Sequence, residues 1–193
     1  MNNDRYDKQP IILASGSPRR AELLERVGVS FEVFPASSEK CPDGLPPAER
    51  VLALSRGKCE EVAAHFPGRT VVGADTMVVL DDEALGKPKN RDDAVEMLLR
   101  LSGRTHRVMT GVWVISPAGA EGFVDTAEVE FYPLTRAEAE RYADTGEPLD
   151  KAGAYGIQGL GMRFVKGIRG DYYNVMGLPV ARLLRLPALQ NEG

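Results

Sequence analysis

Short apolar runs and longer runs with helical periodicity take turns along the chain. Residues 10–15 and 31–34 are apolar and predict buried strands, whereas residues 18–27 between them predict a helix that ends before Gly28. Residues 48–66 repeat apolar side chains at helical spacing, which predicts a longer helix with one buried face. A strand that leads directly into a helix and then into a second strand is typical of α/β proteins.

The middle of the chain continues this alternation. Residues 70–85 predict a strand that is interrupted at Asp75 and turns at residues 81–83. Residues 91–101 predict a helix with Asn90 as its N-cap, and the acidic residues in its first turn agree with the helix dipole.

The next part of the chain predicts a pair of strands, a helix and a loop. Residues 106–116 and 122–134 flank a turn and predict the strands, and "TRAE" at 135–138 predicts a helix opened by a capping box. Residues 147–161 are rich in glycine and show no periodicity, so we expect a shaped loop.

The chain ends with a predicted strand at 162–168, a turn at 170–174 and a helix with Pro179 at its first position. The chain has 193 residues, of which 43% are hydrophobic, and this is enough to bury one good core. We therefore expect one domain, with two lobes at most, whose ends at 1–9 and 188–193 are flexible.

The charge of the chain limits its partners. A formal net charge of −4 and an isoelectric point near 5.3 argue against general binding to nucleic acid or to an anionic membrane, because both need a broad basic surface. Any anion site must therefore be local.

Two cysteines, Cys41 and Cys59, occur in a chain with no signal peptide and no long apolar run. These features predict a reduced, cytoplasmic setting without a disulfide. The cysteines and the two histidines, His65 and His106, lack zinc-site spacing, so we expect no structural zinc site.

Two adjacent arginines occupy an unfavourable place in the first predicted helix. Ser17 is a suitable N-cap and Pro18 a suitable first residue, which puts Arg19 and Arg20 in the first turn. Each cation there costs about 0.3–1 kcal/mol against the helix dipole. Such local conflicts tend to mark functional sites.

An anion would resolve this conflict. Backbone N–H groups, the hydroxyls of Ser15 and Ser17 and two guanidinium groups meet where the strand enters the helix, which suits a phosphate. The alternative is that one or both arginines form ordinary surface ion pairs with nearby carboxylates.

Two further segments carry candidate chemistry. In "VVGADT" at 71–76, Asp75 ends an apolar run at the place where α/β enzymes hold reactive groups, and it could ligate Mg²⁺ or activate a water. An Asp that caps a tight turn is the alternative. In "LGKP" at 85–88, Lys87 could contact phosphate or could be a solvated turn lysine.

These segments together resemble one family. "LASGSPRRAELL", "VVGADTMVVL", "LGKPK", "LSGRTHRVMTGV", "EPLDKAGAYGIQGLG" and "GDYYNVMGLP" are similar to the Maf proteins, in order and at family spacing from about residue 11 to 186. The resemblance implies a mixed twisted β-sheet flanked by helices, in an inosine-triphosphatase-like (Maf/Ham1) fold with a central cleft between two lobes.

The resemblance also implies an activity: metal-dependent hydrolysis of a nucleoside triphosphate between the α and β phosphates, in a homodimer. Asp75 matches the proposed catalytic base, and Asp75 and Glu39 match positions linked to a divalent cation, Mg²⁺ or Mn²⁺. Ser15, Ser17, Arg20, Lys58 and Lys87 are the candidate phosphate-binding residues. Around Glu39, "ASSEK" lacks the second acidic residue that is often present, and "SRGKC" around Lys58 departs from the usual "AxxKA".

Three positions distinguish branches of the family. The branch that acts on 7-methylguanosine triphosphate has motifs similar to "SPWRR", "SDQ" and "SEG". At the three distinguishing positions of these motifs, this chain has Arg19, Thr76 and Gln158. A neutral amide can both donate to and accept from the imide edge of uracil or thymine. The resemblance therefore implies a pyrophosphatase for dTTP and UTP. The alternative is a nucleotide-binding regulator of cell division that does not hydrolyse its ligand.

Overall fold

The computed structural model describes residues 9–37 and 44–190. Within these residues a seven-stranded mixed sheet has the order β2-β1-β3-β5-β6-β7, and β4 pairs with β3. The strands are β1 (Ile11–Ala14), β2 (Phe31–Val33), β3 (Val71–Leu80), β4 (Glu83–Leu85), β5 (Thr105–Ser116), β6 (Gly119–Phe131) and β7 (Val165–Arg169). Strand β1 runs parallel to β2 and β3, and the other pairs are antiparallel. The predicted α/β class with a mixed sheet is confirmed.

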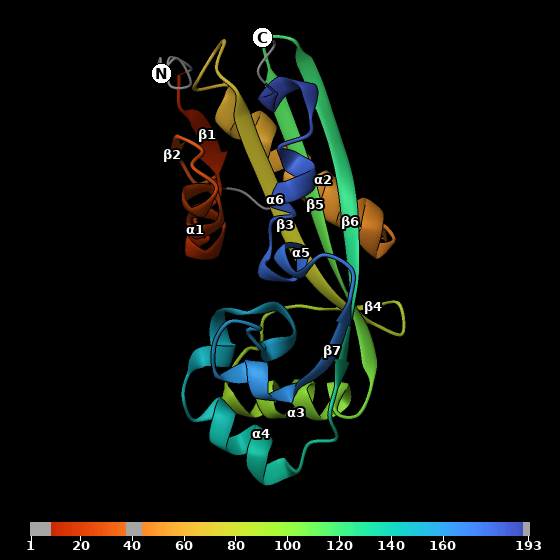
Figure 1. Ribbon diagram of the computed structural model, residues 1–193. Coiled ribbons are helices and arrows are strands. Elements are labelled where there is room, and N and C mark those ends of the chain that lie inside the picture. Colours follow the sequence, from red (N-terminus) through yellow and green to blue (C-terminus); the bar gives the residue numbers. More distant parts are fainter. Residues whose placement is uncertain (1–8, 38–43, 191–193) are drawn as a thin grey trace.

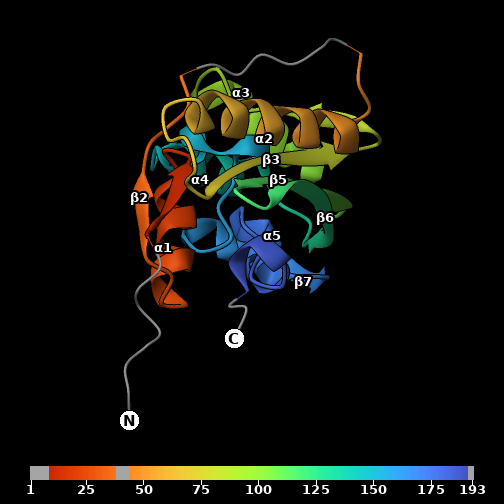
Figure 2. The ribbon, with the colours of Figure 1, turned by 90° about the horizontal axis from the view of Figure 1, so that it is seen from above.

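Helices cover both faces of this sheet (Figure 1). The α-helices are α1 (Pro18–Arg26), α2 (Pro47–Ala63), α3 (Arg91–Leu101), α4 (Arg136–Ala143), α5 (Tyr172–Met176) and α6 (Val180–Leu183), and the 3-10 turns are η1 (Glu147–Asp150), η2 (Ala152–Ala154), η3 (Leu160–Phe164) and η4 (Pro187–Leu189). Figure 2 shows α2 on one side of β3 and β5 and α5 on the other. Helices α3 and α4 and the turns η1 to η3 gather at one end of the long strands, and we call them the α3–α4 unit.

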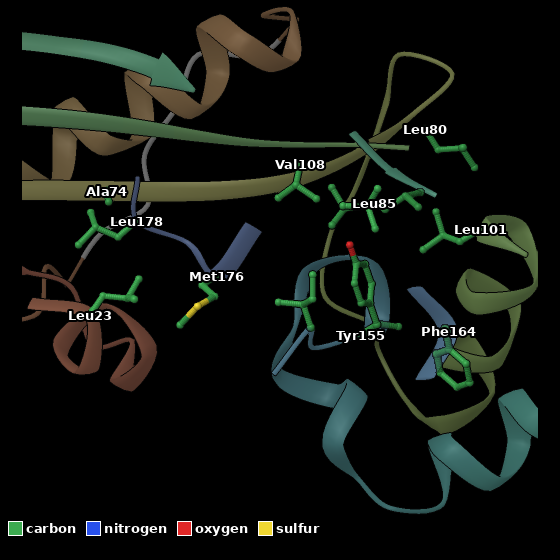
Figure 3. Packing of buried hydrophobic residues seen from close by; sticks show 14 of the residues in the cluster. Leu23, Ala74, Leu80, Leu85, Leu101, Val108, Tyr155, Phe164, Met176 and Leu178 are labelled. Atoms are coloured by element: carbon green, nitrogen blue, oxygen red, sulfur yellow. The ribbon is translucent and has the colours of Figure 1, made fainter. Parts of the chain in front are cut away.

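The strands divide their side chains between two layers of core. In β1, Ile11 and Leu13 enter the larger cluster, whereas Ile12 and Ala14 face α2, as the alternation of a β-strand requires. Figure 3 shows Leu178 between Ala74 of β3 and Leu23 of α1, with Met176 to one side. The same cluster continues through Tyr155, Phe164 and Leu101 to the α3–α4 unit, so one apolar core supports both ends of the molecule.

Helix α2 lies unusually close to the sheet because two glycines face it. A Cβ at Gly73 would lie 2.4 Å from the carbonyl oxygen of Ser55, and a Cβ at Gly111 would lie 2.4 Å from that of Val51. Gly111 pairs across the sheet with Asp75. The close approach of α2 therefore brings the backbone of this helix to the strand positions next to the candidate catalytic acid.

Several local predictions need correction. Strand β3 is not interrupted at Asp75 but continues from Val71 to Leu80, because β5 pairs with it over most of this length. The predicted turn at 170–174 is replaced by the start of helix α5, capped by Asp171. Pro179 is the N-cap of α6 and not its first residue.

The glycine-rich segment and the chain ends also differ in detail from the predictions. The predicted loop at 147–161 is a series of 3-10 turns, and η3 occupies the beginning of the predicted strand at 162–168. The predicted flexible ends fall largely outside the described residues, although η4 reaches Leu189. Nowhere in the described ranges does a helix combine the length and apolar character needed to cross a bilayer.

We predict that Gly111→Ala destabilises the protein. The added methyl group would overlap the α2 backbone, which cannot move as a flexible side chain could, so we expect a loss of about 1–3 kcal/mol in the free energy of unfolding. Urea denaturation measures this loss. Gly167→Ala in β7 is the matched control, because a Cβ there meets nothing within 4 Å. Equal midpoints for both variants would show that α2 does not need the glycine.

Candidate active site

A pocket of about 390 Å³ opens where the β1–α1 junction faces the α3–α4 unit. Its walls also include parts of α2, β3 and the segment 175–177. The pocket lining contains these predicted site residues: Ser15, Ser17, Arg19, Arg20, Lys58, Asp75, Thr76, Lys87 and Gln158. Glu39, the remaining predicted site residue, lies outside the described residues. The structure thus brings together candidates from five separate stretches of sequence around one cavity.

The pocket lies beside a gap in the pairing of β3. On one side of this strand, β1 pairs as far as Gly73, and β4 begins to pair at Val78. Asp75 and Thr76 lie in the interval between the two partners. Asp75 was predicted at the carboxyl end of its own strand, but it lies just beyond the carboxyl end of the parallel neighbour β1. The strand edge is open there because the chain after β1 turns away into α1.

Successive residues in this gap face opposite layers. Asp75 points toward α2, where its Oδ1 accepts a hydrogen bond of 2.7 Å from Lys58 Nζ. The two side chains are only 15% and 11% exposed. Since Asp75 lies within a strand and is held by a lysine, the alternative of a turn-capping Asp is wrong. Asp75 is thus a largely desolvated acid, and the ammonium group of Lys58 in the pocket wall balances its charge.

Arg20 is buried, and protein oxygens receive its N–H groups. Its Nε donates to Gly177 O at 2.8 Å, one terminal nitrogen to Ser15 Oγ at 2.8 Å, and the other to Thr76 Oγ1 at 3.0 Å. The guanidinium group therefore joins the β1–α1 junction, β3 and the segment after α5. The sequence did not predict this structural role, and the phosphate contact of Arg20 stays a prediction.

The polar contacts of Arg20 extend across the sheet. Thr76 Oγ1 lies 3.0 Å from Thr110 Oγ1, and Thr110 Oγ1 donates to Asn174 O at 3.0 Å. The side-chain amide of Asn174 donates to Val108 O at 2.9 Å. Because each member is buried or half-buried, this chain of hydrogen bonds fixes α5 and Gly177 relative to the pocket.

Arg19 reaches across the pocket instead. One of its terminal nitrogens lies 3.7 Å from a carboxylate oxygen of Asp150 in η1. A second polar contact spans the same opening, because Gln158 Nε2 lies 3.5 Å from Glu22 Oε2 of α1. Arg19 thus follows the ion-pair alternative and also lines the pocket. The structure places Arg19 and Gln158, two of the predicted specificity residues, on facing walls.

The remaining phosphate candidates are Ser15 and Ser17 at the strand-to-helix junction and Lys87 after β4. Ser15 Oγ accepts from the backbone N–H of Ser17 at 3.2 Å as well as from Arg20. Ser17 is the N-cap of α1, Pro18 is its first residue, and no acidic side chain occupies the first turn. Lys87 is exposed and lines the pocket, which is compatible with both of its predicted roles.

Tyr155 and Asp150 line the pocket but were not predicted as site residues. Tyr155 Oη lies 2.8 Å from Nε2 of the buried His106, whose Nδ1 has no hydrogen-bond partner in the described part of the chain. Burial lowers the pKa of His106 to about 4, so its imidazole is neutral at pH 7. Burial raises the pKa of Asp150. The opposite effect of Lys151 and Arg19 is larger, so the pKa of this carboxyl lies below its ordinary value. No sequence signal linked His106 to Tyr155.

The pocket contains a candidate carboxylate ligand for a divalent cation, Asp75. The described residues contain no group of three or more His, Cys, Asp or Glu side chains that could hold a metal ion by themselves. Mg²⁺, however, is commonly held by one or two carboxylates, substrate phosphates and waters. Asp75 supplies one such carboxylate beside the cationic wall of the pocket.

Comparisons with known proteins give a consistent result. A family model described as "Maf-like protein" matches residues 10–189. A "dTTP/UTP pyrophosphatase" of Bacillus pumilus is 48% identical over 177 residues, covering 91% of this chain and 94% of the relative. One of the same name from Halalkalibacterium halodurans is 49% identical over 178 residues, covering 92% and 94%. Among solved structures, the Staphylococcus aureus Ham1 protein matches with a TM-score of 0.41 and 17% identity, over 64% of this chain and 72% of that chain.

The two adjacent arginines differ in their contacts, and this difference predicts their energetic roles. Arg20→Lys should lower the free energy of unfolding by about 2–4 kcal/mol, because one ammonium cannot replace a planar group bonded to three segments. Arg19→Lys is the matched control, with an expected change within about 0.5 kcal/mol because its ion pair is long and partly exposed. Urea denaturation of both variants tests this contrast, and similar losses would contradict the role assigned to Arg20.

Proposed function

The chain belongs to the Maf-like protein family, and from this premise we propose that it hydrolyses dTTP and UTP to the nucleoside monophosphate and pyrophosphate. Relatives named dTTP/UTP pyrophosphatase share about half of their residues with it over nearly their whole length. The structural observation that supports this function is the pairing of Asp75 with Lys58 in a pocket that also contains Arg19, Arg20 and Lys87. A carboxylate inside a cationic pocket suits the hydrolysis of a polyanion.

We propose that the triphosphate lies along the wall formed by the β1–α1 junction, α2 and Lys87. The α1 N-terminus, Lys58 and Lys87 would stabilise the negative charge that grows on the leaving pyrophosphate. The buried charge of Arg20 would add to this field, while its hydrogen bonds keep Ser15 and Thr76 in place. Charge that is fixed before the reaction needs no rearrangement during it.

Asp75 is the proposed general base. It would orient a water molecule and accept its proton as the water attacks the phosphorus atom and the bond to the leaving pyrophosphate breaks. Lys58, 2.7 Å from Asp75 Oδ1, fixes the direction of the carboxylate. The strand position of Asp75 supports this role, because a residue within β3 has little freedom to move when substrate binds.

A divalent cation, Mg²⁺ or Mn²⁺, would be held by Asp75 together with phosphate oxygens, and we retain Glu39 as a proposed second ligand. When bound, the ion would neutralise phosphate charge and favour the ionised form of the water.

The base would lie at the other end of the pocket, between Arg19 and Gln158. An amide can satisfy both the donor and the acceptors of the imide edge shared by uracil and thymine. Thr76, the third proposed specificity residue, is bonded to Arg20 and next to Thr110. We also propose a homodimer and a cytoplasmic location, as expected from the resemblance and the composition.

We predict that the purified protein releases pyrophosphate from dTTP and UTP in the presence of Mg²⁺ and acts much more slowly on CTP and 7-methyl-GTP. A site that hydrogen-bonds a substrate edge rejects analogues that cannot complete those bonds. A pyrophosphate assay over these four nucleotides measures the preference. Tight binding of dTTP without any product would favour the regulator over the enzyme.

We predict that Asp75→Asn lowers kcat by about 10²–10⁴-fold, the usual contribution of a general base, while the fold is retained. Asp81→Asn is the matched control, because Asp81 is an exposed carboxylate in the turn after the same strand and pairs with Arg104. Pyrophosphate release and the melting temperature should be measured for both. If Asp75→Asn keeps more than about a tenth of the wild-type kcat, Asp75 is not the base.

A further inference from the structure

The segment 147–161 forms the pocket wall that carries Gln158. Asp150, Lys151, Tyr155 and Gly156 of this segment also line the pocket. The segment consists of 3-10 turns and connecting residues, so no regular ladder of hydrogen bonds fixes it. Arg19 of α1 lies 3.7 Å from Asp150 of this segment across the pocket. Something other than secondary structure must therefore set the position of Gln158.

The carboxylate of Glu147 supplies this missing support from within the segment. Its Oε2 accepts from the backbone N–H of Leu160 at 2.9 Å. Its Oε1 accepts from Tyr142 Oη at 2.8 Å and from the backbone N–H of Gly161 at 3.3 Å. One side chain thus links the end of α4 to Leu160 and Gly161, two and three residues after Gln158.

Tyr142 ties down the other side of Gln158. Its hydroxyl oxygen accepts from the backbone N–H of Gly156 at 3.1 Å while its hydrogen is given to Glu147. Gln158 is therefore flanked by bound backbone groups at Gly156 and at Leu160. Tyr142 is 3% exposed and packs edge-on against Phe164, so this anchor is itself rigid.

The chain passes so close to Glu147 and Tyr142 that a side chain at either of two nearby glycines would displace this pair. A Cβ at Gly159 would lie 2.3 Å from Glu147 Oε1, and a Cβ at Gly161 would lie 2.8 Å from Tyr142 Oη. Neither residue has the positive φ that would by itself call for glycine. The two glycines that follow Gln158 are thus explained by the carboxylate–phenol pair that they contact.

The charge of Glu147 agrees with this arrangement. Burial raises the pKa of Glu147. The hydrogen bonds from Leu160, Tyr142 and Gly161 and the nearby charge of Lys151 have a larger, opposite effect. The pKa of Glu147 is therefore below its ordinary value. Lys151 Nζ also donates to the backbone oxygen of Glu147 at 2.7 Å. An ionised carboxylate is an acceptor at both oxygens, which is what the surrounding donors require.

We infer that Glu147 is a positioning residue for nucleobase selection, because it holds the backbone on the C-terminal side of Gln158 and, through Tyr142, on the N-terminal side. The inference rests on the proposed function, since it assigns Gln158 to the base end of the pocket. Glu147 lies outside the pocket lining and acts through the backbone of Gln158. Its loss should therefore change which base is accepted more than it changes the chemical step.

The test compares Glu147→Gln and Tyr142→Phe with wild type. A glutamine has almost the same size, but its NH₂ group must face at least one of the donors that now meet a carboxylate oxygen. Asp144→Asn is the matched control. Asp144 is an exposed carboxylate at the end of α4, the helix that contains Tyr142, and it pairs with Arg91 outside this network. Tyr142→Phe removes the hydroxyl and keeps the ring, so it covers the case in which Glu147→Gln does not fold.

The decisive measurement is the ratio of kcat/KM for UTP to that for CTP. We expect this ratio to fall by about tenfold or more in Glu147→Gln and in Tyr142→Phe, because a small misplacement of a binding group has large effects on a selected substrate. It should stay at the wild-type value in Asp144→Asn. A merely structural role would reduce the active fraction equally for both nucleotides, so an unchanged ratio would overturn the inference.

Binding separates failure of the inference from failure of the proposed function. The affinities of UMP and CMP, measured by calorimetry, should show the same loss of preference without any turnover. If the wild-type protein releases no pyrophosphate but prefers UMP, and Glu147→Gln lacks this preference, the proposed pyrophosphatase activity is contradicted and the positioning role is supported. A wild-type protein without UMP preference, or variants that retain it, would overturn the positioning role.

Discussion

The site depends on one constraint, the interruption of hydrogen bonding along one side of β3. Because β1 stops pairing at Gly73 and β4 starts at Val78, Asp75 and Thr76 are held in a strand and also exposed to a cavity. On the other side, β5 pairs with them directly, so the backbone is fixed. A strand edge of this kind presents Asp75 to α2 and Thr76 to Arg20, and the pocket receives a side chain from each layer of the protein.

Two charged side chains, one buried and one half-buried, keep the walls around this edge in place. Arg20 joins the first strand-to-helix junction to Gly177, and Glu147 joins the end of α4 to the residues after Gln158. Both are charged groups largely satisfied by protein atoms and not by solvent. Removing either would leave several donors or acceptors without partners, which costs more than the bonds contribute when formed. The irregular parts of the pocket wall can therefore be as well defined as the sheet.

The sequence was sufficient where function depends on local pattern. Ser17 and Pro18 predicted the start of α1. The conflict of Arg19 and Arg20 with the helix dipole led to the phosphate site proposed at this junction, which stays a prediction. The roles of the two arginines could not be separated in this way, because the acceptor that distinguishes Arg20 is the carbonyl of Gly177, far along the chain. Asp75 was expected at the end of its own strand, because sequence periodicity describes one strand at a time. The strand end that lies near Asp75 is the end of β1, and only the fold shows that β1 is its neighbour.

The comparison of Asp75 with Glu147 explains why residue type alone does not identify a reactive carboxylate. Both are partly buried acids near a lysine, and both belong to glycine-containing segments. The described donors to Glu147 are backbone amides and a phenol that also support the chain, so the carboxylate cannot leave them without disturbing the wall. The described partner of Asp75 is the ammonium group of Lys58, a side chain that lines the same pocket and supports no backbone of the pocket wall in the described contacts. The acid that faces the pocket beside a side-chain cation is therefore the one that we propose for catalysis, and the acid bound to the backbone is the one that we propose for holding the wall in shape.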